Sequence, residues 1–144
     1  MDTGSEPVDL EKLAILLQRR YNHLKEIRKL TGEAAEAADR QDEVTLDLIL
    51  QMRGEALERC DRAWQEILLM GEESPEAAAE IHRLILVSPE QVPETSEMER
   101  MIAETRTHCL AVVDQIREQD RILNLRIGKE QSLFNAADPP APRH

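Results

Sequence analysis

Apolar residues recur at alternating steps of three and four through most of residues 10–70. The first stretch keeps this spacing as far as Ala38, with one polar lapse at Arg20, and the second stretch resumes it at Ile49. Such spacing places the apolar side chains on one face of an α-helix. The polar segment between the two stretches, residues 40–43, is long enough only for a tight reversal. The pattern therefore predicts one long antiparallel helical hairpin.

Residues that favour helix ends set the expected bounds of this hairpin. The first helix should run from about residue 10 to about residue 39. It should pass through Gly32, because the apolar spacing keeps its phase there and one interior glycine costs only about 1 kcal/mol. Asp42 is the expected N-cap of the second helix, and Gly71 is its expected end.

The second helix of the hairpin carries a second apolar stripe beside the first. Its members are Leu46, Leu50, Leu57, Trp64 and Leu68. A helix with two apolar stripes is expected to be covered on two sides. The first helix can cover only one of them, so another helix is expected to pack on the second stripe.

Three further elements are expected after the hairpin. Ser74 is the expected N-cap of a short third helix, which has proline at its first position. Residues 88–96 contain two prolines and predict a loop or a single turn. A long last helix should begin near Ser96 or Glu97, and Gly128 is expected to break it.

The apolar seam of the last helix is regular up to Ile116 and irregular beyond it. Gln119 and Asp120 occupy the next position where an apolar residue is expected, and the following apolar residues are spread around the helix. An apolar surplus of this kind is typical of a partner-binding helix. Two alternatives remain open: Leu123 and Ile127 finish the core of the bundle, or the segment self-associates. The candidate partner-binding residues are Ile116, Ile122, Leu123, Leu125 and Ile127.

Composition supports an all-α fold with a thin core. The chain of 144 residues has one Phe, one Tyr and one Trp, so aliphatic residues and alanine must fill the interior. Alanine lets helix backbones approach closely, as in narrow bundles. We expect a single, elongated helical domain: the long hairpin, a short third helix and a long C-terminal helix, with flexible ends at residues 1–7 and about 129–144.

Charge and hydropathy limit the partners that the chain can have. The net charge is −11, and no basic stripe is evident, which argues against nucleic-acid binding. The acidity is typical of a solvated surface, with a docking face for a basic partner as the alternative. No apolar run approaches the roughly 20 residues that span a membrane, and the start of the chain does not resemble a signal peptide. We therefore expect a cytoplasmic protein without membrane insertion.

No pattern in the sequence indicates a metal, a cofactor or a catalytic centre. His23, His82 and His108 lack the Glu-x-x-His spacing of metal-binding bundles. Cys60 and Cys109 fall on apolar stripes and are expected to be buried thiols. One enzymatic alternative is kept, because residues 47–53 have an Asp-x-x-Leu-x-x-x-Arg-like rhythm similar to that of helical chorismate mutases.

The hairpin also resembles a known family, the flagellar export chaperones of the FlgN type (FlgN/FliT-like type III secretion chaperones). The resemblance rests on the leucine rhythm that begins at Leu10, on Gln41-Asp42 at the turn and on Arg53 within the leucine heptads of the second helix. The later order of a short helix, a proline-bearing connector and a long last helix with Asn124 near its end is also similar. The resemblance covers most of residues 8–127.

This resemblance implies a function for the chain and places the implied binding site on the last helix. Such a chaperone binds a hook-associated or other exported subunit, keeps it from assembling prematurely and delivers it to the export apparatus. By position, this role would fall on the five candidate residues between Ile116 and Ile127. The alternatives are a structural coiled-coil or adaptor protein that forms a homodimer and, less favoured, the small helical enzyme.

Overall fold

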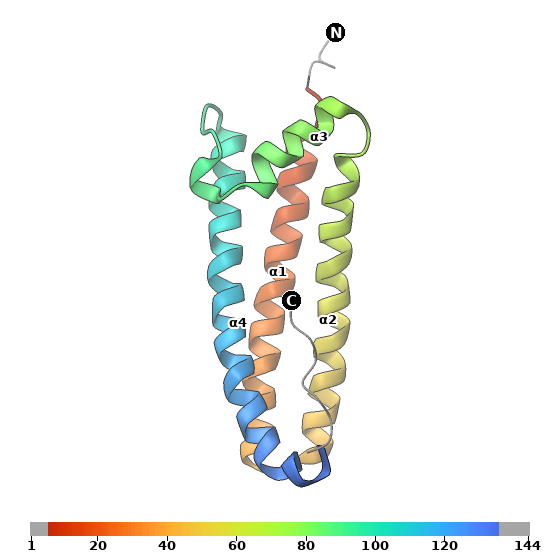
Figure 1. The fold of residues 1–144 in the computed structure, drawn as a ribbon, viewed down its shortest axis with the longest axis vertical. Coiled ribbons are helices and arrows are strands. Elements are labelled where there is room, and N and C mark those ends of the chain that lie inside the picture. Colours follow the sequence, from red (N-terminus) through yellow and green to blue (C-terminus); the bar gives the residue numbers. More distant parts are fainter. Residues whose placement is uncertain (1–5, 136–144) are drawn as a thin grey trace.

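The computed structural model describes residues 6–135, and side chains as far as Gly128. Within this range the fold is all-α and elongated, and three long helices lie side by side while a short helix crosses one end (Figure 1). The predicted flexible ends fall largely on residues 1–5 and 136–144, which lie outside the described residues. The elements are α1 (Leu10–Asp39), α2 (Glu43–Met70), α3 (Pro75–Ile81), the π-helical turn η1 (His82–Leu86), the 3₁₀ turn η2 (Pro89–Gln91) and α4 (Glu97–Asn135).

The predicted hairpin is confirmed, and its reversal takes only three residues. Gln41 has φ 57°, a left-handed conformation, and its N–H donates to the carbonyl of Ala38 at 3.0 Å. The N–H of Asp42 donates to the carbonyl of Ala37 at 2.9 Å. This pair of bonds is a Schellman motif, which ends α1 and satisfies carbonyls that the helix itself leaves unpaired.

Helix starts follow from side-chain capping, as the sequence predicts. The carboxylate of Asp42 accepts a hydrogen bond from the N–H of Thr45 at 3.1 Å and caps α2. The hydroxyl of Ser74 accepts one from the N–H of Ala77 at 3.0 Å and caps α3. Each cap satisfies a backbone donor that would otherwise lack a partner in the first turn.

Gly32 and Gly128 both lie inside helices that continue through them, although only the outcome at Gly32 was predicted correctly. α1 runs unbroken through Gly32, as expected, and α4 runs unbroken through Gly128, so the predicted break there is wrong. Neither glycine has positive φ, and no atom lies within 4 Å of the place a Cβ would take at Gly128. A glycine in a helix interior lowers helix stability by about 1 kcal/mol relative to alanine, and the neighbouring helical turns offset this cost.

The core lies along α1, the middle helix. α1 packs along both α2 and α4, and no comparable packing joins α2 with α4 within the described residues. One apolar cluster occupies the half nearer the hairpin turn and includes Leu24, Ile27, Cys60 and Cys109. A second cluster at the other end joins the three long helices to α3 and η1.

One expectation about packing is therefore wrong. The second stripe of α2 was expected to be covered by another helix, but α4 packs on α1 instead. Of that stripe, Leu46 is buried in the core, Leu50, Trp64 and Leu68 are only partly buried, and Leu57 is exposed. The side of the bundle between α2 and α4 is the less closed one.

Candidate partner-binding surface on the last helix

The five predicted partner-binding residues occupy three different environments on α4. Ile116 and Leu123 are 9% and 3% exposed and belong to the core cluster on α1. Ile122 and Ile127 are partly buried, and Ile127 packs against that cluster. Leu125 is 58% exposed. α4 thus carries the five residues between its middle and the hairpin end of the bundle, and only Leu125 is exposed.

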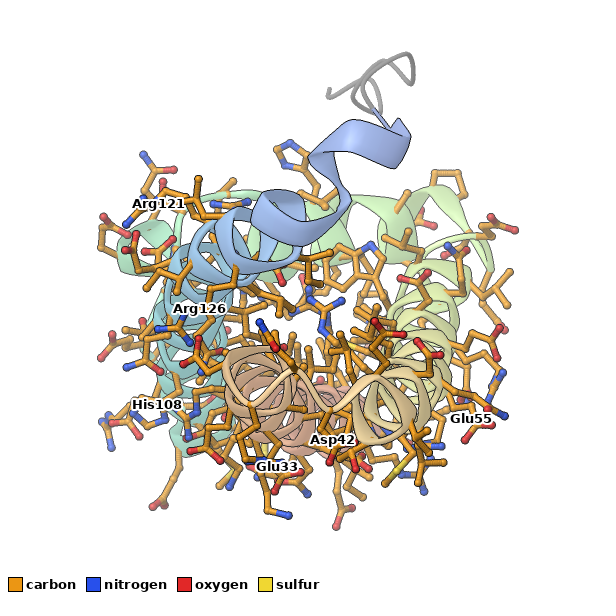
Figure 2. All side chains as sticks on the ribbon, turned by 90° about the horizontal axis from the view of Figure 1, so that it is seen from below. Glu33, Asp42, Glu55, His108, Arg121 and Arg126 are labelled. Atoms are coloured by element: carbon orange, nitrogen blue, oxygen red, sulfur yellow. The ribbon has the colours of Figure 1, made fainter. Side chains whose placement is uncertain are left out.

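Polar contacts hold this end of α4 against the end of α1. The guanidinium of Arg126 lies 3.0 Å from the carboxylate of Asp39 and donates a hydrogen bond to the carbonyl of Ala35 at 3.4 Å. Figure 2 shows Arg126 between α4 and the hairpin end, whereas Arg121 points away from the bundle. The guanidinium of Arg28 also donates to the side-chain oxygen of Gln115. The last helix is therefore fixed in register where it displays Leu125.

Asp120, a polar residue that interrupts the apolar seam of α4, forms an ion pair with a residue of α2. Arg53 donates from Nη2 to both carboxylate oxygens of Asp120, at 2.8 and 2.9 Å. Its Nε donates to the hydroxyl of Thr31 on α1 at 2.8 Å, and that hydroxyl donates to the carbonyl of Ile27. One guanidinium thus joins the three long helices. The sequence singled out Arg53 and Asp120 separately, but no local pattern indicated that the two residues form a pair.

A second polar group, which the sequence did not reveal, holds the start of α4. Arg83 of η1 forms ion pairs with Glu80 and with Glu99, and Glu99 accepts hydrogen bonds from the hydroxyl and the N–H of Thr95. The hydrogen bond from the Thr95 hydroxyl, ahead of the Arg83 contact, holds the pKa of Glu99 below its usual value. Glu80 in turn raises the pKa of Arg83. These residues fix the connector to α4.

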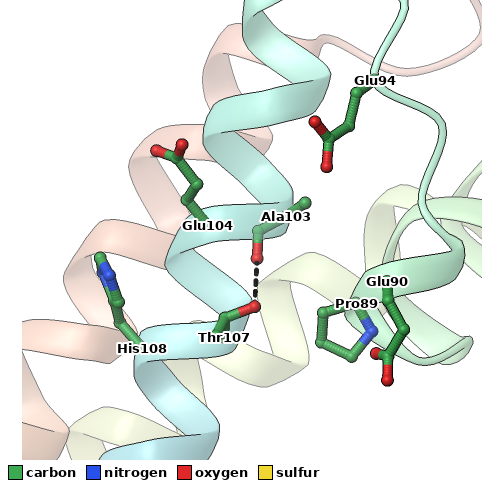
Figure 3. A pocket seen from close by; sticks show the side chains of 7 residues that line it. All are labelled: Pro89, Glu90, Glu94, Ala103, Glu104, Thr107 and His108. Carbon is green, nitrogen blue, oxygen red and sulfur yellow. Dashed lines mark hydrogen bonds between the residues drawn. The ribbon is translucent and has the colours of Figure 1, made fainter.

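An acidic hollow lies beside this connector. It has a volume of about 440 Å³ and is lined by η2, the connector and α4, including Glu90, Glu94, Glu104 and His108 (Figure 3). The hydroxyl of Thr107 points to its own helix and donates to the carbonyl of Ala103 at 3.0 Å. No cluster of three potential metal ligands occurs among the residues that the structure describes. The hollow therefore offers an acidic surface beside the start of α4.

His23, His108 and the two cysteines occupy structural positions. His23 lies 4.0 Å from Glu26, and the ring of His108 packs on Tyr21 with centroids 5.7 Å apart. Cys60 and Cys109 are buried free thiols, as expected, and burial raises the pKa of both.

The arginine on which the enzymatic alternative depends is already engaged. Both Arg53 contacts described above go to side chains of this chain, and its own side chain is only 17% exposed. A ligand carboxylate would have to displace Asp120 to reach it. This geometry favours a structural role for Arg53.

Comparison with known proteins does not assign the chain to a family. No protein-family model, curated protein or solved structure matches the chain. Among the described helices, none combines the length and apolar character needed to cross a bilayer.

Proposed function

We propose that the chain is a non-enzymatic chaperone of the flagellar, type III export kind. In this proposal it binds an exported hook-associated subunit through the C-terminal part of α4. The observation that carries the proposal is the exposure of Leu125 beside the partly buried Ile122 and Ile127, on a helix held in register by Arg126 and Asp120. A fixed helix with an exposed apolar anchor suits binding of a partner helix.

The proposed mechanism needs only binding energy. A subunit helix that would otherwise pair with another subunit lays its apolar face on α4 and is withdrawn from self-assembly. Because the chaperone binds only the unassembled form, mass action shifts the subunit toward that form. Release then requires a competing site, such as the export apparatus, and no nucleotide or cofactor.

Affinity capture with point variants tests the proposal. Deleting everything after Arg117 would also remove Asp120 and Leu123, so a lost partner could reflect a damaged core. Leu125→Asp changes an exposed residue and leaves the core intact. Leu48→Asp is the matched control, because Leu48 lies on α2 and is 56% exposed.

The expected result is capture of one dominant partner by the wild-type chain and by L48D, and its loss from L125D. Equal capture by L125D would contradict the proposed site. Circular dichroism and thermal unfolding of each variant establish that the fold is retained.

A second candidate function, self-association, is favoured by a different observation. Val44, Leu48 and Met52 follow one another at steps of four near the start of α2, and all three are exposed. Apolar residues at this spacing form a stripe that a second copy could cover. Sedimentation velocity distinguishes the two functions: self-association predicts a mass that rises with concentration and falls in L48D.

A further inference from the structure

A small pocket opens where the three long helices and η1 meet, on the less closed side of the bundle. Its volume is about 120 Å³, which corresponds to a single side chain rather than a cofactor. Leu110 of α4, at its edge, is 50% exposed, and Leu57 lies two turns before Trp64 on α2 and is also exposed. Its walls include Leu17, Arg20, Trp64, Ile85, Arg106 and Leu110.

The pocket combines apolar walls with two guanidinium groups and the buried thiol of Cys109. Arg20 stacks on Trp64, with its central carbon 5.0 Å from the ring centroid, and its buried Nε donates to no acceptor in the described part of the chain. Arg106 donates one hydrogen bond to the carbonyl of Leu84 at 3.0 Å. Neither arginine forms an ion pair with a carboxylate between residues 6 and 128, and no carboxylate lines the pocket.

This electrostatic balance is unusual for the chain. The protein carries a net charge of −11, yet two cations share one partly desolvated pocket whose lining includes no carboxylate. Glu90 influences Arg106 only from outside that lining. Burial lowers the pKa of Arg106, which reflects the cost of holding its charge there. A carboxylate would offset this cost and could accept a hydrogen bond from the unpartnered Nε of Arg20.

We propose that this pocket receives one acidic side chain from an amphipathic helix of the partner, which lies along the side between α2 and α4. The helix would cover Leu57, Trp64 and Leu110, so that its apolar face packs on the second stripe of α2. This contact is additional to the proposed one at Leu125, which lies further along α4. Charge complementarity selects an Asp or Glu at its centre and rejects a Lys or Arg. This inference rests on the proposed function, because it specifies the segment that the partner supplies.

The first test uses the wild-type protein and a matched pair of small probes. Trp64 is the only tryptophan of the chain, so its fluorescence reports on the pocket alone. Hexanoate presents a carboxylate on an apolar stem, and hexanamide has the same shape without the charge. The proposal predicts a saturable change in Trp64 emission with hexanoate and a much smaller change with hexanamide. Equal responses to the two probes, or no response to either, would overturn it.

A pair of neighbouring substitutions then locates the effect. Arg20→Gln removes a pocket cation and should weaken hexanoate binding by about tenfold or more. Arg19→Gln removes the same charge from the adjacent position, which does not line this pocket, and should leave binding unchanged. Equal hexanoate affinity in R20Q and the wild type would contradict the proposal.

Partner capture separates failure of this inference from failure of the proposed function. If the wild-type chain captures a partner and R20Q captures it equally well, the pocket between α2 and α4 is not a docking site, although the chaperone function stands. If hexanoate binds as predicted but the wild-type chain captures no partner, the proposed function fails while the anion pocket stands. Loss of partner from R20Q, with retention by R19Q, supports both.

Discussion

Arg53 and Asp120 lie 67 positions apart, yet the guanidinium of one meets both carboxylate oxygens of the other at 2.8 and 2.9 Å. This pair connects α2 with α4, two helices that otherwise pack on α1 rather than on each other. It lies against Thr31 in the middle of the bundle. The pair therefore sets the register of the helix that carries Leu125.

Replacing Arg53 with methionine should lower the free energy of unfolding by about 1–3 kcal/mol. The change keeps an apolar stem but removes three hydrogen bonds and leaves Asp120 without its partner. Urea denaturation followed by circular dichroism measures it. R121M is the control, because Arg121 pairs with Glu118 on the surface and its loss should leave the midpoint unchanged. Equal midpoints for R53M and the wild type would show that the three-helix junction is not stabilising.

Replacing Gln41 with glycine should stabilise the hairpin by about 0.5–1 kcal/mol. Gln41 has φ 57°, a conformation that costs residues other than glycine energy. Part of the gain is offset because glycine makes the unfolded chain more flexible. R40G provides the contrast, since Arg40 has φ −82° and gains nothing from glycine. A lower unfolding temperature for Q41G than for R40G would contradict this account of the turn.

The Glu99 carboxylate should make stability depend on pH. The hydrogen bond from the Thr95 hydroxyl, and secondarily Arg83, keep its pKa in the folded state below the ordinary value of 4.5. Its contribution is therefore complete above that value and is lost as the pH falls through the lower, folded-state pKa. E99Q should be less stable than the wild type at pH 7, and the difference should shrink as the pH drops below about 4.5. E104Q, on an exposed face of the same helix, should show the same dependence of stability on pH as the wild type. If E99Q remained less stable than the wild type at low pH, the proposed link between Glu99 ionisation and stability would be refuted.

Both thiols should react slowly in the native protein. Cys60 and Cys109 are buried, and desolvation raises the pKa of each, so little reactive thiolate forms at pH 7. A disulfide-exchange reagent such as DTNB should label neither thiol quickly in buffer and both rapidly in denaturant. Fast labelling of one thiol in the folded chain would show that its side of the core opens.

Local patterns in the sequence were sufficient for the helices and their ends. Asp42, Ser74 and Gly71 act within one turn of their own position, so their roles can be read from nearest neighbours. Gly128 misled the prediction because a single glycine with ordinary φ lowers helix stability without ending a helix.

Pairings between helices could not be predicted in the same way. Asp120 and Arg20 both interrupt apolar seams, and in each case the explanation lies on α2, at Arg53 and Trp64. The covering of the second stripe of α2 was predicted wrongly for the same reason, because periodicity shows which face is apolar but not which helix meets it.

The positions of residues around the helix predicted part of the candidate site. Leu123 lies seven residues after Ile116 and returns to the same face, so both reach the core. Leu125 is two residues further and faces away from α1, where it is exposed. Distinguishing the core residues from the exposed anchor required the packing of α4 on α1.

Site-specific photo-crosslinking tests the central claim, partner binding at the end of α4, most directly. A photoreactive phenylalanine analogue replaces Leu125 in one version of the chain and Leu48 in the other, and both are irradiated in cells that contain the exported subunits. The account predicts one discrete covalent adduct with an exported subunit from position 125 and none from position 48. An adduct of two copies of this chain, or a subunit adduct from position 48 alone, would contradict it.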